Sequence, residues 1–101
     1  MKYSIFDTHC DTLCSVLDYG KSIVMNECHV DIERMKKYEQ YTQVFACFID
    51  PVYKSCAADR TLNLIDTFHN TVSDKLPDNV RGILSIEGGE GIYSLAHLRN
   101  F

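Results

Sequence analysis

Residues 42–49 read TQVFACFI, and this stretch decides which class of fold the chain adopts. Its apolar residues occupy consecutive positions and include β-branched and aromatic types. A strand with one solvent-exposed face would instead alternate apolar and polar side chains. The pattern predicts a strand that is buried on both faces in a parallel sheet. Asp50 and Pro51 follow at once and predict the end of this strand.

The segments around this strand alternate between strand and helix patterns. Strands are predicted over 3–9, 42–49 and 80–87, and helices over 11–19, 31–38, 57–76 and from 94 onward. Gly20 predicts the end of the first helix, and Lys36 and Lys37 suit the last turn of the second, where cations interact well with the helix dipole. Apolar residues three to four positions apart define the third helix. Residues 21–29 show neither pattern.

This order of elements predicts an α/β protein with parallel strands joined by crossover helices. An open doubly wound sheet fits the order, and so does the start of a (β/α)8 TIM barrel. A complete barrel needs roughly 250 residues. In a barrel, the 101 residues would therefore form one partial domain, 1–101, with the first three βα units. Such an incomplete unit leaves unpaired strand edges, as a small open sheet also would.

Composition excludes several classes of function. Apolar residues make up 46% of the chain and charged residues 24%, and the net charge is -4 without a cluster of Lys or Arg, so nucleic acid is not an expected partner. The longest apolar run, Val44–Ile49, is far shorter than the roughly 20 residues of a membrane span. No signal peptide is recognised, so we expect a cytoplasmic protein. Five cysteines without a C-x-x-C pair predict reduced thiols.

Two short motifs carry the candidate chemistry. His9 and Asp11 lie two residues apart at the end of the first predicted strand, and their imidazole and carboxylate suit a divalent ion such as Zn²⁺. Glu87 ends the third predicted strand before Gly88 and Gly89, which allow a sharp turn or a close approach to a ligand. Either motif alone also fits polar residues facing water. Because active sites of parallel α/β folds gather at the carboxyl ends of strands, the two motifs together predict one metal site.

Other polar residues are weaker candidates. Asp7 either orients the imidazole of His9 or is an ordinary polar residue, and Cys10 is expected to face away from His9 without a base to activate it. Cys28 and His29 form a pair of soft ligands in an irregular segment. The remaining candidates are expected to pack, to face solvent or to cap a loop: His69, His97 and Glu90.

Three blocks of sequence resemble the membrane (renal) dipeptidase family of metallopeptidases, in the order found there. FDTHCDTL at 6–13 resembles the opening metal motif, and HVDIERMKKYEQYTQVFACFID at 29–50 is similar to the following helix and second strand. ILSIEGGEGI at 83–92 resembles the third-strand block, in which a glutamate bridges two metals. The blocks are spread across nearly the whole chain, from 6 to 92, and their combination is far more specific than any one of them.

The resemblance implies a zinc-dependent dipeptidase with a (β/α)8 barrel and two zinc ions. His9 and Asp11 would ligate the first zinc, and Glu87 would bridge both. The substrate would be a dipeptide. No catalytic residue beyond these ligands is implied within the chain, because the family takes its other functional residues from later strands. The 101 residues are therefore expected to be inactive alone. The connection at Pro77–Asn79 is also shorter than in the family.

Two alternatives remain open at this point. The chain would be a non-catalytic remnant or an oligomerising metal-binding module, pairing either with copies of itself or with a missing C-terminal part. A different metallohydrolase of the amidohydrolase type fits less well, because those enzymes usually carry H-x-H where this chain has Asp11 as the second residue.

Overall fold

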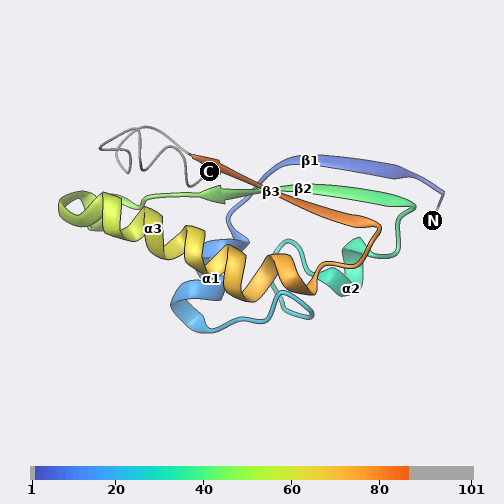
Figure 1. Cartoon of the computed structure of the whole chain (residues 1–101), viewed down its shortest axis with the longest axis horizontal. Coiled ribbons are helices and arrows are strands. Elements are labelled where there is room, and N and C mark those ends of the chain that lie inside the picture. Colours follow the sequence, from blue (N-terminus) through green and yellow to red (C-terminus); the bar gives the residue numbers. More distant parts are fainter. Residues whose placement is uncertain (1, 87–101) are drawn as a thin grey trace.

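A computed structural model describes residues 2–86 as three parallel strands alternating with helices (Figure 1). The strands are β1 (Ser4–Cys10), β2 (Gln40–Cys47) and β3 (Val80–Ile86), and they lie side by side in chain order. The helices are α1 (Thr12–Tyr19), α2 (Ile32–Met35) and α3 (Ala57–Thr67). The predicted α/β class and parallel sheet are confirmed, and the described sheet is open.

All three helices lie on the same side of the sheet (Figure 1). The register between β2 and β3 pairs Gln43 with Gly82 and Phe45 with Leu84. A Cβ atom on Gly82 would lie about 3 Å from Phe68 and Leu76, so these paired residues face the helices. The main core forms between this face and the helix layer, and its residues are Cys10, Leu13, Ile23, Val30, Ile32, Met35, Phe45, Cys47, Leu64, Ile65, Phe68, Val72 and Val80.

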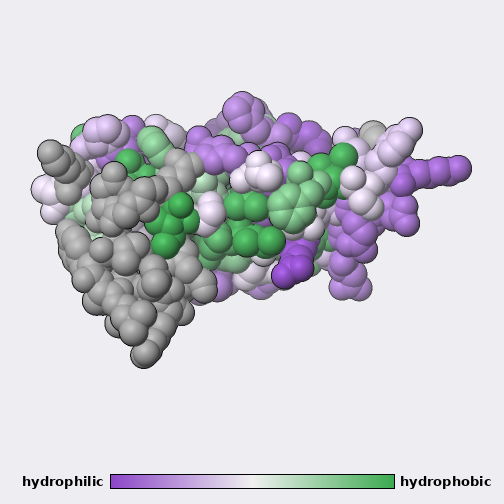
Figure 2. Space-filling model, turned by 90° about the horizontal axis from the view of Figure 1, so that it is seen from above, coloured by the Kyte–Doolittle hydropathy of each residue, from purple (hydrophilic) through white to green (hydrophobic). Residues whose placement is uncertain are grey.

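The opposite face of the sheet carries no helix within residues 2–86 (Figure 1). By register, this helix-free face presents Phe6, Val44 and Ile83, and apolar side chains form a band along it in Figure 2. The Phe6 side chain is 63% exposed, and Thr42 and Val44 are half-buried. The composition of the second strand predicts burial on both faces. In the described structure this burial is incomplete in the amino-terminal half of β2.

The first and third helices follow the sequence prediction closely. Asp11 precedes α1, and Gly20 ends it with a positive φ of 64°, a conformation that glycine adopts without steric cost. A six-residue 3-10 turn (Pro51–Cys56) leads into α3, which continues through a π-helical segment (Phe68–Val72) and a short 3-10 turn (Ser73–Lys75). In this continuation Phe68 packs in the core, and the adjacent His69 is exposed.

The second helix is shorter than predicted. Asp31 caps its amino terminus, but α2 ends at Met35, so Lys36 and Lys37 do not form its last turn as predicted. The reason is a contact distant in sequence. The Asn79 side chain donates hydrogen bonds to the carbonyl oxygens of Lys36 and Tyr38, both at 2.9 Å, and holds them in a turn that leads into β2.

The connection before β3 is short, as the sequence indicates. The backbone N–H of Val80 donates to the carbonyl of Pro77 at 2.9 Å, which closes a tight turn directly after the Leu76 position. Within the part of the chain that the structure describes, no helix is both long and apolar enough to cross a membrane.

Candidate metal-binding site

An irregularity in β1 determines where His9 lies. Asp7 pairs with Gln43 and Cys10 pairs with Phe45, so three steps along β1 match two steps along β2. This extra residue is a β-bulge, a feature that re-aims side chains and is common beside active sites. As a result Cys10 enters the core with 3% exposure, whereas His9 remains exposed at the carboxyl end of the strand.

His9 and Asp11 converge, as their spacing predicts. The distance from His9 Nε2 to Asp11 Oδ1 is 3.1 Å, and both side chains are at least half exposed. Asp11 occupies the N-cap position of α1, where an aspartate usually accepts a hydrogen bond from the first turn, yet its side chain makes no such bond. The carboxylate turns toward the imidazole instead of capping the helix.

The distance between these two atoms suits two ligands of one ion. In a tetrahedral zinc site with ligand atoms about 2.0 Å from the metal, neighbouring ligand atoms lie about 3.3 Å apart. Imidazole nitrogen and carboxylate oxygen are also donor types that zinc accepts. His9 and Asp11 therefore fit part of a ligand shell. An ion pair between an imidazolium and a carboxylate gives a similar distance, so the geometry alone permits both.

The third predicted ligand lies outside the described residues. Glu87, with Gly88, Gly89, Glu90 and His97, belongs to 87–101, and β3 is described up to Ile86. Within residues 2–86, no three His, Cys, Asp or Glu side chains are grouped closely enough to hold a metal ion together. A metal centre at His9 and Asp11 would thus need at least one ligand from elsewhere.

A polar cavity of about 260 Å³ lies directly beside Asp11. Its lining residues come from the start of α1 and from the loop before α2, and they are Asp11, Thr12, Ser15, Glu27, Cys28 and His29. The irregular segment 21–29 therefore comes close to the candidate ligand pair. Cys28 and His29 form part of this wall, but they belong to no cluster of three metal-binding side chains in the described part of the chain.

A buried carboxylate holds this loop in place. Asp31 accepts hydrogen bonds from the backbone N–H groups of Asn26 and Arg34, both at 2.9 Å, and from Arg34 Nε at 3.0 Å. Arg34 also donates to the carbonyl of Cys28 at 2.6 Å. Burial by itself raises the pKa of Asp31, but the hydrogen bonds from Arg34 and Asn26 and the charge of Arg34 outweigh it, so the net pKa lies below its ordinary value.

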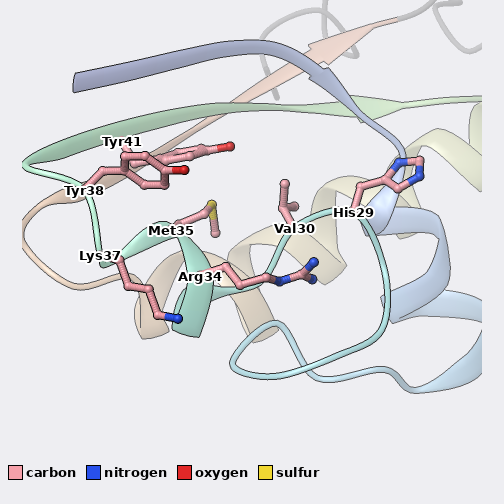
Figure 3. A pocket seen from close by; sticks show the side chains of 7 residues that line it. All are labelled: His29, Val30, Arg34, Met35, Lys37, Tyr38 and Tyr41. Carbon is pink, nitrogen blue, oxygen red and sulfur yellow. The ribbon is translucent and has the colours of Figure 1, made fainter. Parts of the chain in front are cut away.

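A second cavity adjoins the same loop on the helix side of the sheet (Figure 3). It measures about 310 Å³ and is lined by His29, Val30, Arg34, Met35, Lys37, Tyr38 and Tyr41. His29 lines both cavities, and in Figure 3 its ring lies beside the chain where β1 leads into α1. This loop histidine therefore belongs to the walls of both the polar cavity at Asp11 and the more apolar one.

Two further sequence candidates, Asp7 and Cys10, lie near His9 on β1. Asp7 accepts a hydrogen bond from the backbone N–H of His9 at 3.1 Å, and the regular register before the bulge pairs Asp7 with the helix-facing Gln43. In a regular strand Asp7, His9 and Asp11 would share one face, but β1 is irregular between Asp7 and Cys10. Burial raises the pKa of the Cys10 thiol to about 11, which argues against a nucleophile.

One ion pair carries no signal in the sequence. Arg60 in α3 is 8% exposed, and its Nη1 and Nη2 atoms donate to the two carboxylate oxygens of Asp18 in α1. The guanidinium also lies 4.3 Å from the centre of the Tyr53 ring. These residues are up to 42 positions apart, so neither periodicity nor a local motif could reveal the contact.

No protein-family model matches this sequence, and comparison with curated proteins gives no match either. Within residues 2–86, the structure shows the convergence of His9 and Asp11 and a parallel sheet with its helices on one face.

Proposed function

We propose that this chain supplies the N-terminal βα units of a zinc-dependent dipeptidase with a (β/α)8 barrel. The observation that carries the proposal is the side chain of Asp11, which leaves the end of α1 uncapped and lies 3.1 Å from His9 Nε2. A carboxylate that forgoes a local hydrogen bond worth about 1 kcal/mol is consistent with a ligand. Glu87 would complete the first metal site and bridge to a second zinc, which needs ligands from later strands.

The arrangement of the sheet fits the first units of a barrel, and one half of a doubly wound sheet has the same arrangement because its crossovers share one hand. A barrel carries its helices outside and fills its interior with strand side chains. Here the described helices cover one face only, and the strands follow the order β1-β2-β3 (Figure 1). The helix-free face with Phe6, Val44 and Ile83 would then be the barrel interior.

Three residues of the described chain would have defined parts in the reaction. His9, in its neutral form, and Asp11 would hold the first zinc at the mouth of the barrel, and Asp7 would fix the backbone of His9 through its hydrogen bond. A pair of bound zinc ions supplies a hydroxide nucleophile and polarises the scissile carbonyl. The polar cavity beside Asp11 would receive one end of the dipeptide.

Zinc affinity tests the ligand assignment. With His9, Asp11 and Glu87 as ligands, we expect His9→Ala and Asp11→Ala to weaken zinc binding at least tenfold in competition with a chromophoric chelator. His69→Ala is the matched control, because His69 is exposed in the π-helical segment that follows α3. Equal affinity in the His9→Ala variant and the parent chain would exclude the site.

Hydrolysis tests the rest of the proposal. With the catalytic and second-metal residues supplied by later strands, dipeptide hydrolysis by residues 1–101 with added Zn²⁺ should stay at background. Fast turnover by these residues alone would show that no later strands are required. Activity that returns when further βα units are joined or added, and disappears in the His9→Ala variant, is the result expected of a barrel dipeptidase.

The sheet also supports a second candidate, an oligomerising module. Within residues 2–86, the outer edges of β1 and β3 have no neighbouring strand, and Phe6 is exposed on the helix-free face. Unpaired edges and apolar patches of this kind favour association. Light scattering distinguishes the candidates: a stable monomer at high concentration would count against self-association through these edges.

A further inference from the structure

A third cavity lies at the carboxyl end of β2, apart from the His9–Asp11 pair. It measures about 320 Å³, close to the lower end of the roughly 300–1,000 Å³ of small-molecule sites. Its lining residues come from α1, from the chain after β2 and from α3, and they are Cys14, Asp18, Tyr19, Phe48, Asp50, Val52, Tyr53 and Arg60. The carboxyl ends of parallel strands are where α/β proteins bind ligands.

The rim of this cavity is apolar and open to solvent. Tyr19 and Val52 are each 76% exposed, and Phe48 is 37% exposed. They account for three of the seven large apolar side chains that are exposed in the described structure, and they come from α1 and from the chain after β2. Their convergence on one cavity provides aromatic and aliphatic contact surface for a bound group.

The floor of the cavity is held rigidly. Arg60 forms its double hydrogen bond with Asp18 and lies over Tyr53, while the Cys14 thiol donates to the carbonyl of Phe48 at 3.6 Å. Asp50 is fixed as well, because its Oδ1 atom accepts from the backbone N–H of Val52 at 3.0 Å. A site with fixed walls loses little conformational entropy when it binds a ligand.

The charges of the cavity favour a cation. Asp18 and Asp50 contribute two negative charges, and Arg60, whose charge is matched by Asp18, contributes one positive charge. The carboxyl end of α1 lies at Tyr19, where the helix dipole adds further negative potential. Aromatic rings attract cations through their faces, and Tyr19 and Phe48 line this cavity.

We propose that this cavity binds an organic cation with an aliphatic stem, such as an alkylguanidinium or alkylammonium group. The Asp50 carboxylate would balance its charge, and Tyr19, Phe48 and Val52 would contact its stem. Either a small free molecule or the Arg or Lys side chain of a protein segment would present this chemistry. The proposal does not depend on the zinc site, since it uses none of its ligands.

Two ligands of the same shape test the role of charge. N-Butylguanidinium should bind and shift the NMR signals of Tyr19, Phe48 and Tyr53, whereas neutral N-butylurea should bind at least about fivefold more weakly. Comparable binding of both would overturn the proposal, and so would the absence of shifts at these residues at millimolar concentration.

Variants of the protein test the residues. Asp50→Asn removes one charge but retains an oxygen that can accept from Val52, so the chain should fold normally and bind N-butylguanidinium about fivefold more weakly. Asp66→Asn makes the same charge change on the exposed surface of α3 and should leave the affinity unchanged. Unchanged affinity in Asp50→Asn would exclude Asp50 as the counter-ion and thereby the proposed site.

A peptide distinguishes the two sources of the cation. A short peptide with one central Arg that binds at least tenfold more tightly than N-butylguanidinium, with the same loss in Asp50→Asn, indicates a protein segment as partner. Equal or weaker peptide binding indicates a small free cation. Both results agree with the proposed cation site. Peptide binding that is insensitive to Asp50→Asn would argue against this site.

Discussion

The carboxylate of Asp18 in α1 accepts two hydrogen bonds from the guanidinium of Arg60 in α3, at 2.6 Å from Nη1 and 2.7 Å from Nη2. The Arg60 side chain is 8% exposed and that of Asp18 is 30% exposed. Hydrogen bonding with Asp18 raises the pKa of Arg60 further, so the arginine stays charged in this setting. The pair joins two helices that are distant in sequence.

Removing Asp18 should destabilise the fold. Asp18→Ala leaves Arg60 charged and largely buried without a counter-ion, and we expect the free energy of unfolding to fall by about 2–3 kcal/mol. Urea denaturation followed by circular dichroism measures the change. Glu33→Ala breaks the exposed pair of Glu33 and Lys36 and should cost less than about 0.5 kcal/mol. Equal losses of unfolding free energy in the two variants would mean that the buried pair stabilises the fold no more than the exposed pair.

Asp31 should make the stability depend on pH in the acid range. Its pKa is lowered in the folded state, so its contribution is fully present above the unfolded value of roughly 4 and is lost as the pH falls through the folded pKa. We expect the free energy of unfolding of the parent chain to exceed that of Asp31→Asn by about 1–3 kcal/mol at neutral pH. This difference should shrink below about pH 4. Denaturation at a series of pH values measures it, with Asp66→Asn as control. A gap that stays constant down to pH 2 would contradict the expectation.

The cysteines should differ strongly in reactivity. Burial raises the pKa of Cys47 to about 12 and that of Cys10 to about 11, so neither forms much thiolate near pH 8, whereas Cys56 is exposed. Brief treatment with iodoacetamide should label Cys56 and leave Cys10 and Cys47 unmodified, as peptide mass spectrometry would show. In urea all five cysteines should react. If Cys47 in the folded chain were labelled as fast as Cys56, this would contradict the burial of Cys47.

A side chain at Gly82 should destabilise the packing between β3 and the helix layer. A Cβ atom there would lie 3.0 Å from Leu76 Cδ1 and 3.1 Å from the Phe68 ring, so Gly82→Ala should cost about 1–3 kcal/mol of stability through overpacking, and Gly82→Val more. Gly20→Asn is an informative contrast, because Gly20 faces open space and asparagine accepts its positive φ with little strain. Thermal unfolding would rank the variants. A Gly82→Val variant as stable as the parent would contradict the packing described for β3.

Much of the architecture follows from local sequence. Apolar runs over the three strands and the three- to four-residue spacing over 57–76 predicted the elements and their parallel pairing, because burial imposes these periods wherever a strand or helix has a core to face. The H-x-D motif also predicted that His9 and Asp11 meet, since residues this close at a strand end have few ways to diverge. Glu87 stays a prediction, because it lies outside residues 2–86.

Contacts between distant segments decided the rest. Asn79 ends α2 from 41–43 residues away, the pairing with β2 gives β1 its bulge, and Arg60 reaches Asp18 across two helices. The sequence by itself determined which segments are strands and helices and which polar residues stand at a strand end. The tertiary structure alone decided that the described helices share one face and that the irregular segment 21–29 lies close to Asp11. Such pairings depend on how the elements pack and leave no periodic trace in a single chain.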